Sequence, residues 1–215
     1  MMFPRPLRIA CFLLCLASAL RAQTPAQSPK HADKSAVDSA LDAGAVTDNV
    51  YRNKTLGLAY KIPDGWVLRT DEMNAADEKT PDPAKSAEAG SKVLLAAFSR
   101  PPLAKGEDVN SSIVISAQSA AAFPGLKDVA QYFPLVVESA KAQGFIEDEE
   151  PYEYSLGTKT LGRADFHRDK GTRVVHESTL AMLSHGYAIS IAVTAGTDDE
   201  IEELIDALTF PATTK

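Results

Sequence analysis

The sequence predicts an α+β fold, specifically an α/β/α sandwich in which a mostly antiparallel sheet is covered by helices on both faces. Three β-rich runs, residues 158–169, 172–183 and 187–194, follow one another with short turns between them and predict a meander of three strands. Helical periodicity lies on either side of this meander, over residues 123–143 and again after residue 197. A sheet with apolar or small side chains on both faces must be covered twice, so the pattern favours a layered sandwich.

Two tight turns, Lys170-Gly171 and His185-Gly186, are expected to set the register of the meander. Glycine suits the second position of a two-residue hairpin turn, and histidine is among the non-glycine residues that tolerate positive φ. These turns would pair residue 169 with residue 172, and residue 184 with residue 187. One face of the sheet then carries large apolar side chains, and the other carries small ones that let a helix approach closely: Gly162, Ala164, Ala181, Ala188 and Ala192.

Three further strands are expected before the meander. Residues 56–62 alternate between apolar and other positions, and a Pro-Asp-Gly turn closes this strand just before Trp66, the only tryptophan. Residues 93–98 and 112–118 are short β-rich runs that predict two neighbouring antiparallel strands.

The helices and one long connection complete the predicted domain. Pro134 is expected to kink or divide the helix over residues 123–143. The last helix begins with a capping box, Thr-Asp-Asp-Glu at residues 197–200. Residues 70–92 are charged and contain proline and alanine, so they predict a solvated surface loop, with a lid or partner-binding loop as the alternative.

Residues 1–22 have the layout of a secretory signal peptide, with a signal anchor as the alternative. Arg5 and Arg8 precede an apolar run over residues 9–20 that is short for a membrane span, and small residues suitable for cleavage follow. Residues 23–49 contain almost no large apolar side chain and predict a disordered tether. Residues 50–215 then form one domain, exported to the periplasm or secreted, with no stable membrane span once the leader is cleaved.

Charge and cysteine content exclude several classes of protein. The chain has 22 basic and 29 acidic residues, and cleavage after residue 22 would leave 19 basic residues and a net charge of −10. Such a domain is repelled by polyanions, which argues against nucleic acid and anionic membranes as partners. Both cysteines, Cys11 and Cys15, lie in the leader, so the cleaved domain has no disulfide and no thiol nucleophile.

Two short motifs, Gly-Leu-Ala-Tyr at residues 57–60 and Pro-Asp-Gly-Trp at residues 63–66, precede two strands, a long helix, the meander and a capped helix. This order of elements resembles the PsbP-like family over residues 51–211. The resemblance implies an α/β/α sandwich and an exported bacterial protein of unknown function. Members of the family act mainly as binding or assembly factors, so the resemblance also implies a protein that is not an enzyme.

The expected register brings three potential metal ligands together. Asp165 would lie opposite His176, with His167 two residues along on the same face. Two imidazoles and a carboxylate could hold a divalent metal such as zinc or copper. The alternatives are a purely structural hydrogen-bonded group, or a His-Asp pair beside Ser178 as a nucleophile. The acidic run at residues 147–150 could collect a hard cation, although a solvated connector fits it better.

Three functional interpretations follow from the sequence. The first is a binding or accessory domain that contacts an unidentified protein partner in the cell envelope or outside the cell. The second is a small-ligand or divalent-metal carrier that uses Asp165, His167 and His176, and no other cofactor is expected. The third is a hydrolase. Its site would have to be unconventional, because the sequence contains no nucleophile elbow, phosphate loop, dinucleotide fingerprint or zinc-protease helix.

Overall fold

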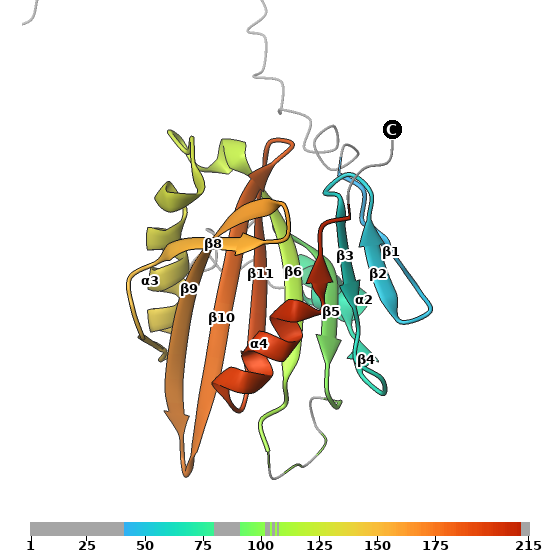
Figure 1. Cartoon of the computed structure of the whole chain (residues 1–215), viewed down its shortest axis with the longest axis vertical. Coiled ribbons are helices and arrows are strands. Elements are labelled where there is room, and N and C mark those ends of the chain that lie inside the picture. The colour runs from blue at the N-terminus through green and yellow to red at the C-terminus, as the bar shows by residue number, and fades with distance from the viewer. Residues whose placement is uncertain (1–40, 80–90, 102–103, 105, 107, 212–215) are drawn as a thin grey trace, which may run out of the picture. The chain divides into compact units, whose positions relative to one another are not determined.

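An eight-stranded antiparallel sheet forms the centre of the domain (Figure 1). The computed structural model describes residues 41–79, 91–101, 104, 106 and 108–211. Along the sheet the strands run β4 (Val67–Leu68), β5 (Ser91–Phe98), β6 (Ser112–Ser119), β11 (Tyr187–Ala195), β10 (Arg173–Ser184), β9 (Lys159–Lys170) and β7 (Ile146–Glu147), and β8 (Tyr152–Leu156) also pairs with β9.

A second, smaller sheet and three α-helices pack around the large sheet. The small sheet contains β1 (Ala45–Thr47), β2 (Val50–Asn53), β3 (Leu58–Lys61) and β12 (Leu208–Thr209). The α-helices of the described residues are α2 (Thr70–Lys79), α3 (Phe133–Ala142) and α4 (Asp198–Asp206), and the short 3-10 helices are η2 (Ala120–Ala122) and η3 (Val129–Gln131). None of these helices is both long enough and apolar enough to cross a membrane.

The two faces of the large sheet contribute to two separate hydrophobic cores. On one face, large apolar side chains of β6, β10 and β11 pack against α4 and the small sheet, and α4 lies in front of the sheet in Figure 1. On the other face, Ala164, Phe166 and Ala181 pack against Phe133 and Ala140 of α3. Helices therefore cover both faces, and the predicted α+β sandwich with a mostly antiparallel sheet is confirmed.

The meander is confirmed, but one of its two registers differs from the prediction. The turn at His185 and Gly186 is as expected, with Ser184 opposite Tyr187 and positive φ at both turn residues. At the other turn, Lys170 pairs with Arg173, so Gly171 and Thr172 make the reversal. Gly171, at φ 70°, thus occupies the first turn position rather than the second. Every β9–β10 pair is consequently displaced by two residues from the predicted one.

The N-terminal boundary of the domain lies before residue 50, which corrects the C-terminal end of the predicted tether. Strand β1 pairs with β2, and Leu41 is buried in the core at 5% exposure. Tyr51 is buried as well, and its hydroxyl donates a hydrogen bond to the Ala43 carbonyl oxygen (3.0 Å). The region predicted as one strand over residues 56–62 is the second arm of a hairpin made by β2 and β3. The predicted signal peptide and the rest of the tether lie outside the described residues.

Helix α2 replaces the first half of the predicted loop over residues 70–92. It has no apolar stripe to dock it, and polar side chains attach it to the edge of β5 instead. The Asn74 side chain accepts from the Val93 amide (3.0 Å) and donates to the Val93 carbonyl oxygen (3.0 Å). Thr70 Oγ1 accepts from the Ala96 amide (3.0 Å). Residues 80–90 lie outside the described part of the chain.

Pro134 begins a helix rather than kinking one. Residues 123–132 form turns and the short helix η3, and α3 starts at Phe133 with the proline in its first turn. A proline there costs no hydrogen bond, because the first amides of a helix have no partner within it. The capping box predicts the start of α4 correctly, since Thr197 Oγ1 accepts from the Glu200 amide (3.2 Å).

Candidate functional site

The three predicted metal ligands lie on one face of β9 and β10, but not in the predicted arrangement. His167 lies directly opposite His176, and Asp165 lies opposite Ser178. Each of the three potential ligands has its own partner elsewhere in the fold. Within the described residues, no group of three or more His, Cys, Asp or Glu side chains is arranged to hold a metal ion.

Asp165 is the centre of a hydrogen-bonded network that joins β8, β9 and α4. Arg163 Nε donates to both of its carboxylate oxygens (2.9 and 3.0 Å), and the Tyr152 hydroxyl donates to Oδ2 (2.8 Å). Arg163 also reaches Glu202 on α4 and lies over the ring of Tyr154, 5.0 Å from its centroid. Both carboxylate oxygens of Asp165 thus accept hydrogen bonds within the protein.

The electrostatics of this network suit a structural connection. Burial raises the pKa of Tyr152, and the hydrogen bond to Asp165 raises it further, so the phenol stays protonated as a donor. Burial lowers the pKa of Arg163, but hydrogen bonds to Glu202 and Asp165 outweigh this effect and raise it overall. The two donors of the network, Tyr152 and Arg163, therefore both stay protonated at neutral pH.

The two histidines form a cross-strand pair whose rings are each held by a carboxylate. His167 Nδ1 contacts Asp148, and His176 Nδ1 lies 2.6 Å from Asp198 Oδ1. A carboxylate on Nδ1 fixes the ring orientation and leaves Nε2 as the nitrogen that could coordinate a metal. The pair could thus supply two imidazole ligands, without a contribution from Asp165.

Ser178, the nucleophile of the alternative hydrolase interpretation, lies inside the core. Its side chain is fully buried at 0% exposure. Its hydroxyl oxygen has no hydrogen-bond partner among the described atoms, so no base is positioned to activate it. A substrate could reach this oxygen only if the core opened.

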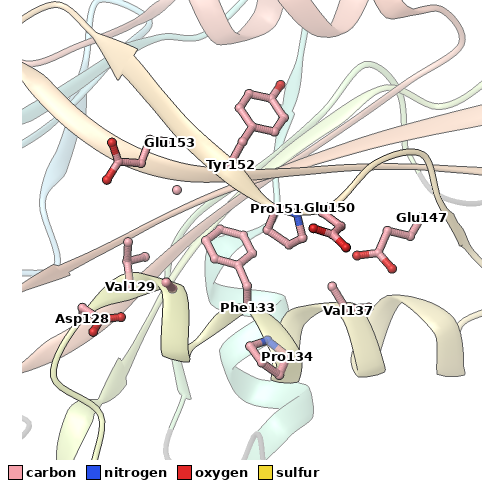
Figure 2. Close-up of a pocket in the computed structure, with 12 residues that line it drawn as sticks. Asp128, Val129, Phe133, Pro134, Val137, Glu147, Glu150, Pro151, Tyr152 and Glu153 are labelled. Carbon is pink, nitrogen blue, oxygen red and sulfur yellow. The ribbon is translucent and has the colours of Figure 1, made fainter.

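A pocket of about 530 Å³ lies on the other face of the sheet, between α3 and the segment that contains β7 and β8 (Figure 2). We call it the α3–β8 pocket. Its apolar lining comes mainly from Val129, Phe133, Pro134, Val137 and Pro151. Four carboxylates also line it, from Asp128, Glu147, Glu150 and Glu153, and none of its twelve lining residues is basic.

Gly162 on β9 allows Phe133, which lines this pocket, to pack closely against the sheet. A β-carbon built on Gly162 would lie 2.1 Å from Cε2 of Phe133, so the ring packs directly on the glycine backbone. The predicted close approach of a helix to the small-residue face is confirmed at this position. Phe133 is buried at 3% exposure and forms the base of the pocket between the two acidic sides (Figure 2).

The four carboxylates differ in how strongly the fold already engages them. Asp128 caps η3 by accepting from the Gln131 amide (3.1 Å), and Glu147 pairs with Lys141 (2.9 Å). Glu150 and Glu153 are exposed, and neither side-chain carboxylate makes a hydrogen bond or an ion pair within the described residues. Two negative charges of the pocket are therefore available to a ligand.

Sequence reasoning missed this pocket. The sequence predicts a solvated connector for the acidic run at residues 147–150, whereas two of its members, Glu147 and Glu150, line the pocket. The available signal was the combination of this run with a small-residue strand and a helix that begins Phe-Pro, but the three segments are far apart in the sequence.

Several solved structures share features of this fold. Cyanobacterial PsbP from Synechocystis sp. PCC 6803 matches with a TM-score of 0.46 and 14% identity, over 77% of this chain and 95% of that one. LpqN of Mycobacterium tuberculosis, described as involved in cell envelope biogenesis, matches with a TM-score of 0.38 and 18% identity, over 71% of this chain and 82% of that one. The Ran-binding protein Mog1p of Saccharomyces cerevisiae matches with a TM-score of 0.38 and 12% identity, over 72% and 80% of the two chains.

No protein-family model matches the chain, and no curated protein matches it. The solved structures are similar to this chain at low sequence identity, and no family assignment follows from them.

Proposed function

We propose that the chain is an exported accessory domain that binds another protein through the α3–β8 pocket. The observation that carries this proposal is a preformed apolar hollow with two unengaged carboxylates, Glu150 and Glu153, at its rim. Binding sites commonly combine an apolar lining with a few polar groups that fix orientation. The leader-like residues 1–22 support export, and the acidic composition argues against polyanionic partners.

The pocket supports binding better than catalysis. Its buried base is the aromatic ring of Phe133, whereas Glu150 and Glu153 lie at its exposed rim. General acid–base catalysis needs a group whose pKa is tuned close to the working pH. Glu150 and Glu153 are exposed carboxylates that line the pocket, which suits recognition of a partner's positive charge.

A substitution that fills the pocket tests the proposal. Ala130 is exposed on η3 and lines the pocket, so Ala130→Trp places a large ring in it without removing core atoms. Ala142 is exposed at the end of α3 and does not line the pocket, so Ala142→Trp is a matched control.

The three baits are compared by affinity capture from a native envelope extract. We expect wild type and Ala142→Trp to recover the same discrete protein, and Ala130→Trp to lose it while keeping a wild-type circular dichroism spectrum. Equal recovery by all three baits would place the contact elsewhere on the surface, and recovery of background proteins only would remove the proposal.

The cross-strand pair of His167 and His176 favours a second candidate function, a carrier of a divalent metal. Two imidazoles suit zinc or copper, and the contacts to Asp148 and Asp198 would orient both rings. Isothermal calorimetry with zinc and with copper should then give a heat that His176→Ala abolishes. His185→Asn is the control, because it removes a histidine from a turn residue with φ 52° that asparagine also adopts. Identical titrations of the two variants would eliminate this candidate.

A further inference from the structure

We infer that the α3–β8 pocket binds an extended protein segment in which one apolar side chain lies between two basic ones. This inference rests on the proposed function and specifies the chemistry of the partner. It follows from three properties of the pocket: an apolar centre, acidic groups on two sides of it, and the engagement of only some of those groups by the fold itself.

The apolar centre suits a single aliphatic or aromatic side chain. Phe133, Val137 and Pro151 surround the middle of the pocket, which has a volume of about 530 Å³. Ligand pockets commonly range from about 300 to 1,000 Å³, so the volume of this one lies in the lower half of that range. An apolar side chain placed there would cover the exposed part of Val137 and exclude water from the base of the pocket.

The carboxylates lie on two sides of this centre. In Figure 2, Asp128 and Glu153 are on one side of Phe133, and Glu147 and Glu150 are on the other. On each side, one carboxylate is already engaged within the fold, Asp128 as a helix cap and Glu147 by Lys141. One unengaged carboxylate thus remains on each side, Glu153 and Glu150.

This distribution selects the partner's charge pattern. A single cation would neutralise one side and leave the other unpaired, whereas two basic residues that flank an apolar one can meet both. In an extended segment, side chains two residues apart point in the same direction, and each residue spans about 3.3 Å. A segment of the form basic, any, apolar, any, basic therefore places all three groups on one surface. An acidic segment would be repelled from both sides of the pocket.

Short labelled peptides test this pattern by fluorescence anisotropy with the full-length purified chain. The probe is a fluorescein-labelled Lys-Ala-Leu-Ala-Lys peptide. Its controls are Lys-Lys-Ala-Ala-Leu, which has the same composition in another order, and Glu-Ala-Leu-Ala-Glu, which reverses the charge. We expect the probe to bind about tenfold more tightly than either control, with an affinity that falls as salt is added.

Paired charge variants assign the effect to the two carboxylates. Glu150→Gln combined with Glu153→Gln should weaken binding of the probe by about fivefold, as expected for the loss of two exposed ion pairs. Glu203→Gln combined with Asp206→Asn removes the same charge from exposed positions on α4 and should leave the affinity unchanged.

The outcomes separate this inference from the proposed function beneath it. If all three peptides bind equally, and Ala130→Trp abolishes their binding, then the pocket is a binding site and the charge pattern is wrong. If the two charge-variant pairs weaken binding equally, the specific role of Glu150 and Glu153 is likewise refuted. If no peptide binds, and Ala130→Trp also leaves partner capture unchanged, then both the inference and the proposed function fail.

Discussion

Adding one methyl group at Gly162 is expected to destabilise the domain, because Phe133 occupies the space that the methyl would need. The new β-carbon would lie 2.1 Å from Cε2 and 2.8 Å from Cζ of the ring, far inside ordinary van der Waals contact. Gly162 has no positive φ, so alanine causes no backbone strain and the effect is steric. The neighbours cannot easily move, since Phe133 begins α3 and is almost fully buried.

The magnitude follows from two opposing effects. Overpacking of a filled core costs about 1–3 kcal/mol. Replacing glycine by alanine also restricts the unfolded chain, which returns about 0.4–1 kcal/mol. The free energy of unfolding should therefore fall by about 1–2 kcal/mol, which lowers Tm by about 2–8 °C for a domain of this size.

Urea denaturation followed by circular dichroism measures this change, with Gly196→Ala as the control. Gly196 also lacks positive φ, and its nearest neighbour would lie at an ordinary 3.6 Å from the new β-carbon, so this variant should be neutral or slightly stabilised. In the double variant Gly162→Ala with Phe133→Leu, the smaller side chain should recover part of the loss, so the double variant should be destabilised by less than the sum of the two single variants. A Gly162→Ala variant as stable as Gly196→Ala would show that α3 does not press on β9 at this point.

Three further substitutions have expected outcomes of their own. Thr197→Ala removes the cap of α4 and should lower the free energy of unfolding by about 1 kcal/mol, whereas Thr197→Ser should retain it in the same urea titration. Burial raises the pKa of Glu177 in the folded state, although Arg168 and Thr194 partly oppose this, so ionised Glu177 is disfavoured by folding. As the pH rises from the ordinary glutamate pKa through the raised pKa of Glu177, the wild type should therefore lose stability relative to Glu177→Gln. A Tm difference between the two proteins that is the same at pH 4 and pH 7 would contradict this. Ser178→Ala removes a buried hydroxyl that has no hydrogen-bond partner in the part of the chain that the structure describes. The substitution should leave stability unchanged or raise it by about 1 kcal/mol, so a loss in thermal denaturation would reveal a partner.

The architecture could be predicted from the sequence because local signals agreed with one another. The turn at His185 and Gly186 accommodates positive φ at both residues, and the alternation on either side of it fixes which face is buried. The capping hydroxyl of Thr197 likewise marks the start of α4 from the sequence alone. In each case the decisive contact joins residues that are close in the chain.

The exact β9–β10 register could not be predicted in the same way. The predicted and observed pairings differ by two residues, and a shift of two preserves the face on which every side chain lies. The apolar pattern is therefore equally satisfied by both, and only the position of Gly171 in the turn distinguishes them. The metal hypothesis depended on that choice, because Asp165 lies opposite His176 in one register and Ser178 in the other.

The pocket and α2 were not predicted because they depend on contacts between distant segments. Phe133 and Gly162 contact each other in the fold, but the acidic run at residues 147–150, which also lines the pocket, lies between them in the sequence. Helix α2 lacks an apolar stripe, so periodicity alone indicates a loop, and its attachment through Asn74 becomes visible only when β5 is beside it.

The attachment of α2 has a consequence for how the sheet ends. The side-chain amide of Asn74 presents an acceptor and a donor to Val93, just as the backbone of an additional strand would. Together with Thr70 and the two residues of β4, Asn74 occupies backbone hydrogen-bonding groups along β5. Without these contacts β5, whose sequence is Ser-Lys-Val-Leu-Leu-Ala-Ala-Phe, would present an unpaired edge that a strand of a second molecule could join. A single asparagine thereby helps to keep copies of the protein from joining edge to edge at high local concentration.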